Sequence, residues 1–408
     1  MRILADRNIP FVKEAFRELG EVAALDTPLI TNQRVREADI LIVRSEIPVD
    51  EKLLRGTPVR FVGSATAGTD HIDTDYLRSS RIAFANSPGC NSNSVKEYVV
   101  AALLAYASRN SLSLRGKTLG VVGVGNVGSK VVRAAEALGM IVLQNDPPLA
   151  RTTDESRFVP LNAILEADFI TLHVPLTRGG PDPTYHLLDQ VQFDRMKQGA
   201  VLLNTARGPV VSTTALKHAF TQGRLSAALL DVWENEPGID IEALLLAAIG
   251  TAHVAGYSMD GKMAAVGRVR EAVCQHFGFS SAWDPALYLR SPEPSHIELN
   301  TAQLSDETAL HRIVRRAYNI EEDDVRLRVT LSLPPQAQAA HFTRLRTGYP
   351  YRREFSSFTV DLPPEYSRLE STLSSLSFPC STARSGRQRF PAQAGGVKVA
   401  PSALSGKT

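Results

Sequence analysis

The chain has 408 residues, which is too long for one ordinary domain and suggests two or three. Hydrophobic residues make up 43% of it and charged residues 22%, which is the composition of a folded globular protein. The 45 basic and 43 acidic residues give a net charge of +2, and the sequence has no long Lys/Arg run. This charge balance gives no reason to expect a nucleic-acid partner.

The cysteines and the apolar runs indicate where the protein works. Cys90, Cys274 and Cys380 are widely spaced and form no Cys-x-x-Cys pair, which favours a reducing compartment. The opening MRILADRNIP carries charges and a proline where a signal peptide needs an apolar core. The longest apolar run, YVVAALLAYA at 98–107, is about half the length of a membrane span. We therefore expect a soluble, cytoplasmic protein with no membrane partner.

The first hundred residues alternate short apolar runs with helix-like segments such as PFVKEAFRELG. Apolar runs without polar alternation are typical of parallel strands that are covered on both faces. We predict such strands at 2–6, 40–45, 60–65 and 82–87, and therefore a βαβ organisation. A long helix is expected from Ser94 to Ser108, and its Ser-Val-Lys-Glu start has the form of a capping box.

The same rhythm restarts with a strand at 118–125, and further strands are predicted at 141–146, 169–175, 200–206, 226–232 and 251–256. The fold class is therefore α/β, with two Rossmann-like, doubly wound parallel sheets. We expect residues 1–95 and 256–287 to form a substrate-binding domain, into which a dinucleotide-binding domain, residues 96–255, is inserted.

The composition changes after about Tyr288. SPEPS at 291–295 is typical of a linker, and ETALHRIVRRAYNIEEDDVRLR predicts a helix followed by a turn. From 359 to 408 the chain is rich in Ser, Pro, Gly and Ala without a core-forming period, which predicts a disordered tail.

GVGNVG at 123–128 follows a strand and opens a helix, the context in which Gly-x-Gly-x-x-Gly binds a dinucleotide. Gly123 would form the tight turn, Gly125 would let the backbone approach a pyrophosphate, and Gly128 would let helix and strand pack closely. Asp146, at the end of the next strand, would bond the ribose hydroxyls and repel a 2′-phosphate. This pattern predicts NAD as the cofactor, the alternative being a glycine turn in a domain that binds no nucleotide.

Residues suited to catalysis lie at or just beyond the ends of the later predicted strands. Arg207 lies in NTARGPVV, the acids Asp231, Glu234 and Glu236 in LDVWENEP, and His253 in TAHVAGYS. Oxidation of a 2-hydroxy acid needs a cation for the carboxylate, a base for the hydroxyl proton, and a carboxylate to orient that base. Arg207, His253 and Glu236 fit these roles. Taken singly, each of them would more simply be a surface arginine, a solvated acid or a buried structural histidine.

Two loops of the first domain, VRSEIPV (43–49) and SATAGTDHID (64–73), combine small residues with hydroxyls and can form an anion-binding nest. Arg44 would add a positive charge there, and Ser45 and Thr66 would add donors. His71 is interpreted as structural. No His or Cys pair has metal-ligand spacing, so we expect no metal site.

GVVGVGNVG, NTARGPVV, DVWENEP and HVAGYS occur in the order and spacing of the D-2-hydroxyacid dehydrogenase family, which the chain resembles. The resemblance implies that Arg207, Glu236 and His253 are catalytic. It implies that Ser45, Thr66 and Tyr257 contact the substrate, beside Arg44. Contacts with NAD are implied for Gly123, Gly125, Asn126, Val127, Gly128, Asp146, Val174, Ala206, Arg207, Asp231 and Gly256. Val174 stands where we expect a threonine, so only a backbone contact would survive there.

SPGCNSNSVKEYV, NDPPLAR and HVAGYSMDGK resemble one branch of this family in particular, from Met1 to about Phe358. That branch acts on a phosphorylated 2-hydroxy acid and carries an extra dimerisation domain. FTRLRTGYPYRREFSSF resembles the end of that domain. The resemblance therefore implies a small α+β domain over residues 288–358 and a homodimer that forms through it. Arg352 and Arg353 in this segment are expected on a solvated basic face, the alternative being that they reach the phosphate site of a neighbouring subunit.

Two alternatives stay open. One is a dehydrogenase for another acid, of the 3-phosphoglycerate or the glyoxylate and hydroxypyruvate type. The other is a non-catalytic NAD-sensing protein that reuses the fold, as some transcriptional corepressors do. The set of Arg207, Glu236 and His253 argues against the sensor, because a sensor needs no base.

Overall fold

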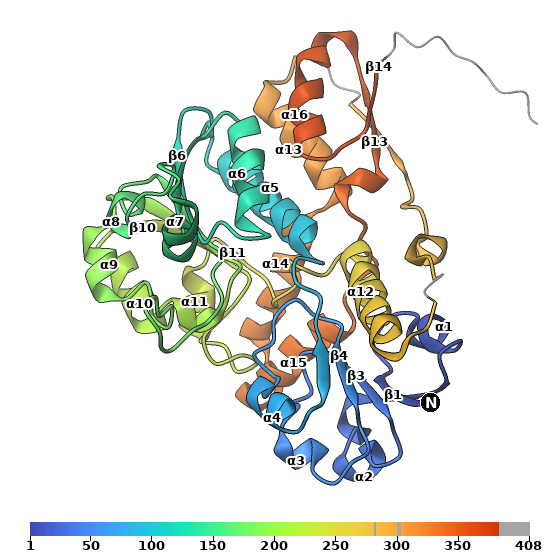
Figure 1. Cartoon of the computed structure of the whole chain (residues 1–408). Helices are drawn as coiled ribbons and strands as arrows, with labels where there is room; N and C mark the ends of the chain where they lie inside the picture. The colour runs from blue at the N-terminus through green and yellow to red at the C-terminus, as the bar shows by residue number, and fades with distance from the viewer. Residues whose placement is uncertain (281–282, 300–302, 383–408) are drawn as a thin grey trace, which may run out of the picture.

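The computed structural model describes residues 1–280, 283–299 and 303–382, and it is organised around three parallel sheets (Figure 1). The strand orders are β2-β1-β3-β4-β5, β11-β10-β9-β8-β6-β7 and β12-β13-β14. The first and second sheets lie at the bottom and left of Figure 1, and the third lies at the top. Parallel sheets with helical connections confirm the predicted α/β class.

The first sheet contains β1 (Arg2–Asp6), β2 (Glu21–Leu25), β3 (Ile40–Val43), β4 (Phe61–Ser64) and β5 (Ala83–Ala85). Its helices are α1 (Val12–Phe16), α2 (Asn32–Val35), α3 (Glu51–Leu54), α4 (Thr74–Ser79) and the returning α12 (Met259–Phe277). Every residue of β3 and β4 is buried, as expected of central parallel strands. The edge strand β2 was not predicted, although four of its five residues, EVAAL, are apolar; only Ala24 among them is buried in the structure.

The second sheet contains β6 (Thr118–Val122), β7 (Ile141–Asn145), β8 (Phe169–Leu172), β9 (Ala200–Asn204), β10 (Leu225–Leu230) and β11 (Ile249–Gly250). Its helices are α6 (Gly128–Ala137), α7 (Pro147–Thr153), α8 (Leu161–Ile164), α9 (Gln190–Arg195), α10 (Thr213–Thr221) and α11 (Ile241–Leu246). The strand predicted at 251–256 is wrong, since β11 ends at Gly250. The amides of Val254 and Ala255 bind the Asp231 carboxylate, so they are not available to a sheet.

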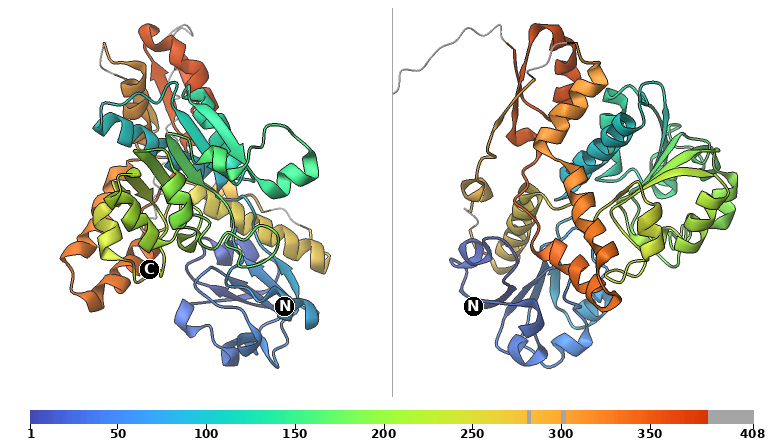
Figure 2. Two further views of the ribbon diagram at one scale, coloured as in Figure 1. Left: turned by 90° about the vertical axis from the view of Figure 1, so that its left-hand side faces the viewer. Right: turned by 180° about the vertical axis from the view of Figure 1, so that it is seen from behind.

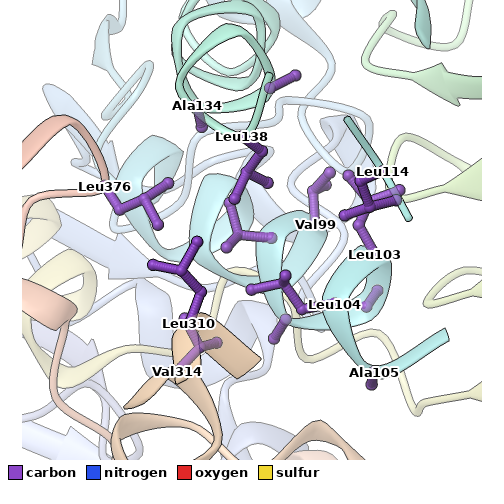
Figure 3. Close-up of a cluster of buried hydrophobic side chains, with 14 of the residues drawn as sticks. Val99, Leu103, Leu104, Ala105, Leu114, Ala134, Leu138, Leu310, Val314 and Leu376 are labelled. Atoms are coloured by element: carbon purple, nitrogen blue, oxygen red, sulfur yellow. The ribbon is translucent and has the colours of Figure 1, made fainter. Parts of the chain in front are cut away.

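Helix α5 (Ser92–Arg109) connects the two sheets and is buried along most of its length. Figure 3 shows its Val99, Leu103 and Leu104 among side chains of α6 and of α13 (Asp306–Ala317). The predicted capping box is wrong, because the helix begins two residues earlier and Ser94 lies inside it. The Ser94 hydroxyl instead donates to the Ala255 carbonyl at 2.7 Å.

The C-terminal region contains β12 (His296–Glu298), α13, α14 (Ile320–Arg328), α15 (Pro335–Thr347), β13 (Thr359–Leu362), α16 (Glu370–Ser375) and β14 (Cys380–Thr382). Figure 2 shows α13, α14 and α15 running along the back of the molecule, from the third sheet toward the first. Short 3₁₀ turns lie at Thr27–Leu29, Gly208–Val210, Pro285–Tyr288, Val329–Ser332, Phe355–Ser357 and Pro364–Leu369.

The disordered tail predicted from residue 359 begins too early. β13, α16 and β14 are ordered, and Val360, Leu362 and Leu373 are buried. Their partners are distant in the chain: β13 pairs with β12, and Leu376 packs near α5. A local pattern therefore could not reveal them. The rest of that prediction, 383–408, lies outside the described residues, and the other domain limits stay predictions.

None of the helices in the described ranges combines the length and the apolar character that crossing a bilayer requires.

Candidate active site

A cleft of about 640 Å³ lies between the first and second sheets, at the C-terminal ends of their strands. Open parallel sheets bind ligands at this edge. The chain crosses between the sheets twice beside the cleft, at residues 88–91 and 254–257, and both crossings line it. Of the predicted site residues, those that line it are Arg44, Ser45, Thr66, Asn126, Val127, Val174, Ala206, Arg207, Asp231, Glu236, His253, Gly256 and Tyr257.

His253 and Glu236 form a hydrogen-bonded pair in this cleft, with His253 Nδ1 2.7 Å from Glu236 Oε2. Glu236 Oε1 also accepts from the Trp233 amide at 2.8 Å. Burial acts to raise the pKa of Glu236, but the charge and hydrogen bond of His253, the Trp233 amide and the charge of Arg346 together outweigh burial, and the net pKa is lowered. The ionised carboxylate can only accept, so Nδ1 carries the proton, and in the neutral imidazole Nε2 then has a free lone pair. The pair is therefore built as an oriented base.

Asp231 shapes the turn that presents His253. The Asp231 carbonyl accepts from the His253 amide at 2.7 Å, and its carboxylate accepts from the amides of Val254 and Ala255 at 2.8 and 2.9 Å. The Thr251 hydroxyl donates to the same carboxylate at 2.6 Å. His253 has φ 57°, a left-handed conformation that is uncommon for a residue with a side chain. The sequence predicts only a cofactor contact for Asp231 and does not reveal this positioning role.

Arg207 follows β9 and reaches across the cleft to Asp70 in the 64–73 loop. Arg207 Nε and Nη2 donate to the same Asp70 oxygen at 2.9 and 2.8 Å. The fork of the guanidinium, which would bind a carboxylate ligand, is thus occupied by a carboxylate of the protein. A Cβ added at Gly68 would lie 2.2 Å from Arg207 Nη2, so the loop approaches the arginine closely. Neither contact was predicted.

The glycine loop has the shape that a dinucleotide requires. Gly123 has φ +86°, and a Cβ added at Gly128 would lie 1.9 Å from the Gly123 carbonyl oxygen, so both positions need glycine. A Cβ added at Gly125 meets nothing within 4 Å, which leaves open space for a ligand. Asp146, at the end of β7, accepts from the Val124 amide at 2.8 Å and so lies beside the loop. These residues fit the proposed cofactor, although they do not line the cleft itself.

The other end of the cleft is more basic than the sequence suggests. Arg44 pairs with the buried Asp6 at 3.2 Å and with Glu46 at 3.1 Å. Lys262 of α12 and Arg346 of α15 also line the cleft and were missed. Lys262 belongs to the HVAGYSMDGK segment that singled out one branch of the family, which could have served as a signal. Arg346 gave no signal, because its helix lies in another part of the chain.

The solvated face expected for Arg352 and Arg353 is wrong. Arg352 is 6% exposed and donates to the carbonyls of Ser94 and Ala255 at 3.0 and 3.1 Å. Arg353 binds both oxygens of Asp260. These arginines attach the C-terminal region to the rest of the molecule, because they donate hydrogen bonds to carbonyls and to a carboxylate of the protein instead of to water.

Comparison with known proteins gives a consistent picture. The family described as D-isomer specific 2-hydroxyacid dehydrogenase, NAD binding domain, matches residues 93–255, and a domain of unknown function, DUF3410, matches 289–376. An erythronate-4-phosphate dehydrogenase from Salinibacter ruber is 45% identical over 375 residues, covering 88% of this chain and 94% of that protein. One from Cronobacter sakazakii is 42% identical over 366 residues, covering 90% and 95%.

Solved structures resemble about two thirds of the chain. The TT0316 protein of Thermus thermophilus has 29% identity and a TM-score of 0.60, covering 69% of this chain and 98% of its own. D-Lactate dehydrogenase from Aquifex aeolicus, complexed with NAD and lactic acid, has 26% identity and a TM-score of 0.57, covering 68% and 96%.

Proposed function

The chain belongs to the D-2-hydroxyacid dehydrogenase family, in its erythronate-4-phosphate dehydrogenase group, and we propose that it oxidises 4-phospho-D-erythronate with NAD. The product is 2-oxo-3-hydroxy-4-phosphobutanoate, in a step of pyridoxal 5′-phosphate biosynthesis. The observation that carries this proposal is the His253–Glu236 pair at 2.7 Å, which shares one cleft with Arg207 beside a dinucleotide-binding loop.

The three side chains divide the work of the reaction. When bound, NAD supplies the acceptor for the hydride that leaves C2 of the substrate. Arg207 holds the substrate carboxylate through its planar fork once it is released from Asp70. His253 Nε2 takes the proton of the C2 hydroxyl as the carbonyl forms, a role worth about 10²–10⁴ in rate. Glu236 keeps Nδ1 protonated and stabilises the resulting imidazolium.

The cofactor contacts follow the glycine loop. Gly123, Gly125 and Gly128 would admit the pyrophosphate at the N-terminus of α6, and Asp146 would bond the ribose hydroxyls and disfavour a 2′-phosphate. Further contacts are proposed for Asn126, Val127, Val174, Ala206, Arg207, Asp231 and Gly256. Ser45, Thr66 and Tyr257 would contact the substrate, next to Arg44.

The substrate can be tested directly by following NADH formation with 4-phosphoerythronate, 3-phosphoglycerate and glycolate. We expect the highest kcat/KM with 4-phosphoerythronate. A clear preference for either of the other acids would overturn the proposed substrate and leave the family assignment standing. NAD binding without turnover of any of the three would favour a sensor instead.

We also propose a cytoplasmic homodimer that forms through the C-terminal region. Val325 of α14 and Val329 just beyond it are 64% and 45% exposed, which supports an apolar contact there. Light scattering of the full chain tests this, with Val325→Asp compared with Val191→Asp in the second domain, where Val191 is 58% exposed. Loss of the dimer only in Val325→Asp supports the proposal, whereas a monomeric wild type or an unaffected Val325→Asp dimer contradicts it.

A further inference from the structure

Arg346 enters the cleft from a part of the chain that neither catalysis nor cofactor binding uses. It lies near the end of α15, is 18% exposed, and its guanidinium carbon is 5.8 Å from the centre of the Tyr257 ring. The nearest ion-pair partner is Glu46, at 3.8 Å, which is too long for a hydrogen bond. Its Nε is buried and has no hydrogen-bond partner. A buried donor without a partner is costly, so this site has the character of an anion site.

Lys262 approaches the same tyrosine from α12. Its Nζ lies 4.4 Å from the centre of the Tyr257 ring. Within residues 1–280, 283–299 and 303–382, no carboxylate forms an ion pair with this ammonium group. Burial, together with the charges of Arg44 and Arg352, lowers the pKa of Lys262 to about 8. The protein therefore holds a cation here that Glu46 influences electrostatically without forming an ion pair with it.

The surrounding charges leave a positive excess at this end of the cleft. Arg44, Lys262 and Arg346 face Asp6 and Glu46, and the third nearby carboxylate, Glu236, is already paired with His253. Asp6 is fully buried and also accepts from Asn8 and Thr27, so much of its capacity is used away from the cleft. A phosphate monoester carries about −1.5 to −2 charges at pH 7. It would balance the excess and provide acceptors for Arg346 Nε, which has no hydrogen-bond partner, and for the Lys262 ammonium group.

We propose that Arg44, Lys262 and Arg346 form the binding pocket for the substrate phosphate, with Arg346 making the C-terminal region a determinant of specificity for phosphorylated acids. Tyr257 lies between the lysine and the arginine and follows His253 in the same loop. Arg346 also interacts electrostatically with Glu236, so the pocket adjoins the catalytic pair. The carboxylate would bind Arg207 and the phosphate Arg346, with C2 at His253. This inference rests on the proposed function, since it assigns a subsite to its substrate.

The test compares 4-phosphoerythronate with D-erythronate, which lacks only the phosphate. The variants are Arg346→Gln and Lys262→Gln. The matched control is Arg344→Gln, because Arg344 is an exposed arginine on the same helix that does not line the cleft. The quantity measured is the ratio of kcat/KM for the two acids. Charge-assisted hydrogen bonds predict that this ratio falls about 10- to 100-fold in each variant and stays at the wild-type value in the control.

A second readout does not depend on turnover. Calorimetric titration of 4-phosphoerythronate into the enzyme–NADH complex should show Kd rising by a similar factor in both variants, with NADH affinity unchanged. Wild-type ratios and Kd values in folded variants would overturn the pocket while leaving the proposed function intact. A wild type that does not discriminate between the two acids would instead contradict the proposed function. If Arg346→Gln does not fold, Lys262→Gln decides.

Discussion

Replacing Asp70 with asparagine should strengthen substrate binding. In the structure one Asp70 oxygen accepts two hydrogen bonds from Arg207, at 2.9 and 2.8 Å, so the protein itself occupies the fork that the substrate carboxylate needs. Binding must break this contact before the new one forms. Asparagine keeps the shape of the side chain but removes the charge, and the competition should weaken.

The size of the effect follows from the exposure of the pair. The side chains of Arg207 and Asp70 are 31% and 50% exposed, and ion pairs of this kind are worth about 0.2–1 kcal/mol. Because about 1.4 kcal/mol corresponds to a factor of ten, the Kd of 4-phosphoerythronate should fall by a factor of about 1.4 to 5. The difference between wild type and Asp70→Asn should shrink at high ionic strength, since exposed pairs are screened.

The assay is titration of the enzyme–NADH complex with 4-phosphoerythronate, alongside steady-state kcat and KM. The control is Asp75→Asn, because Asp75 forms an exposed ion pair with Arg78 at 2.8 Å and does not line the cleft. That variant should bind like the wild type. Weaker binding by Asp70→Asn would refute the reasoning, since it would mean that Asp70 holds Arg207 in its working orientation.

Three further predictions concern the base, the glycine loop and the lysine of the phosphate pocket. His253→Ala should lower kcat by about 10²–10⁴ with NAD affinity unchanged, and a folded variant with wild-type turnover would contradict its role as the base. Gly125→Val should weaken NAD binding at least about tenfold, because the side chain would occupy the space proposed for the pyrophosphate. The Tm should change little, since a Cβ there meets no protein atom within 4 Å. An unchanged NAD affinity in calorimetry would contradict the proposed contact between Gly125 and the pyrophosphate. Because the pKa of Lys262 is lowered to about 8, its ammonium group is charged below pH 8 and loses its proton above it. The KM for 4-phosphoerythronate should therefore rise above pH 8 in the wild type, and this rise should be missing in Lys262→Gln. The charged or titratable groups facing this lysine are Arg44, Glu46, Tyr257, Arg346 and Arg352.

The sequence could predict what local pattern and strand order determine. Arg207, Glu236 and His253 follow different strands, and parallel pairing brings those strand ends to one edge of the sheet. The glycine loop was predictable for the same reason, since strand, turn and helix are consecutive in the chain. Apolar residues around His253 nevertheless suggested a strand, because the pattern does not reveal that Asp231 binds the amides of this segment.

Contacts between distant parts of the chain were not predictable. Asp70 meets Arg207 only because two loops from different sheets face each other across the cleft. Arg346 reaches the cleft because α15 packs beside it, and no periodicity encodes that approach. The end of the C-terminal region was misjudged for the same reason: β13 owes its order to pairing with β12, more than fifty residues earlier.

Arg352 has a consequence for how the two sheets are connected. It donates to Ser94, beyond the first crossing of the chain, and to Ala255, in the second, so one guanidinium joins both segments that run between the two sheets. Lys96 and Glu97 of α5 also bind backbone groups of the C-terminal region, at Leu376 and Phe355. The C-terminal region is therefore bound to both segments that connect the sheets and is not a detachable module. A chain truncated near residue 288 would lose these contacts and expose α5, and would report on the integrity of the whole enzyme more than on its oligomeric state.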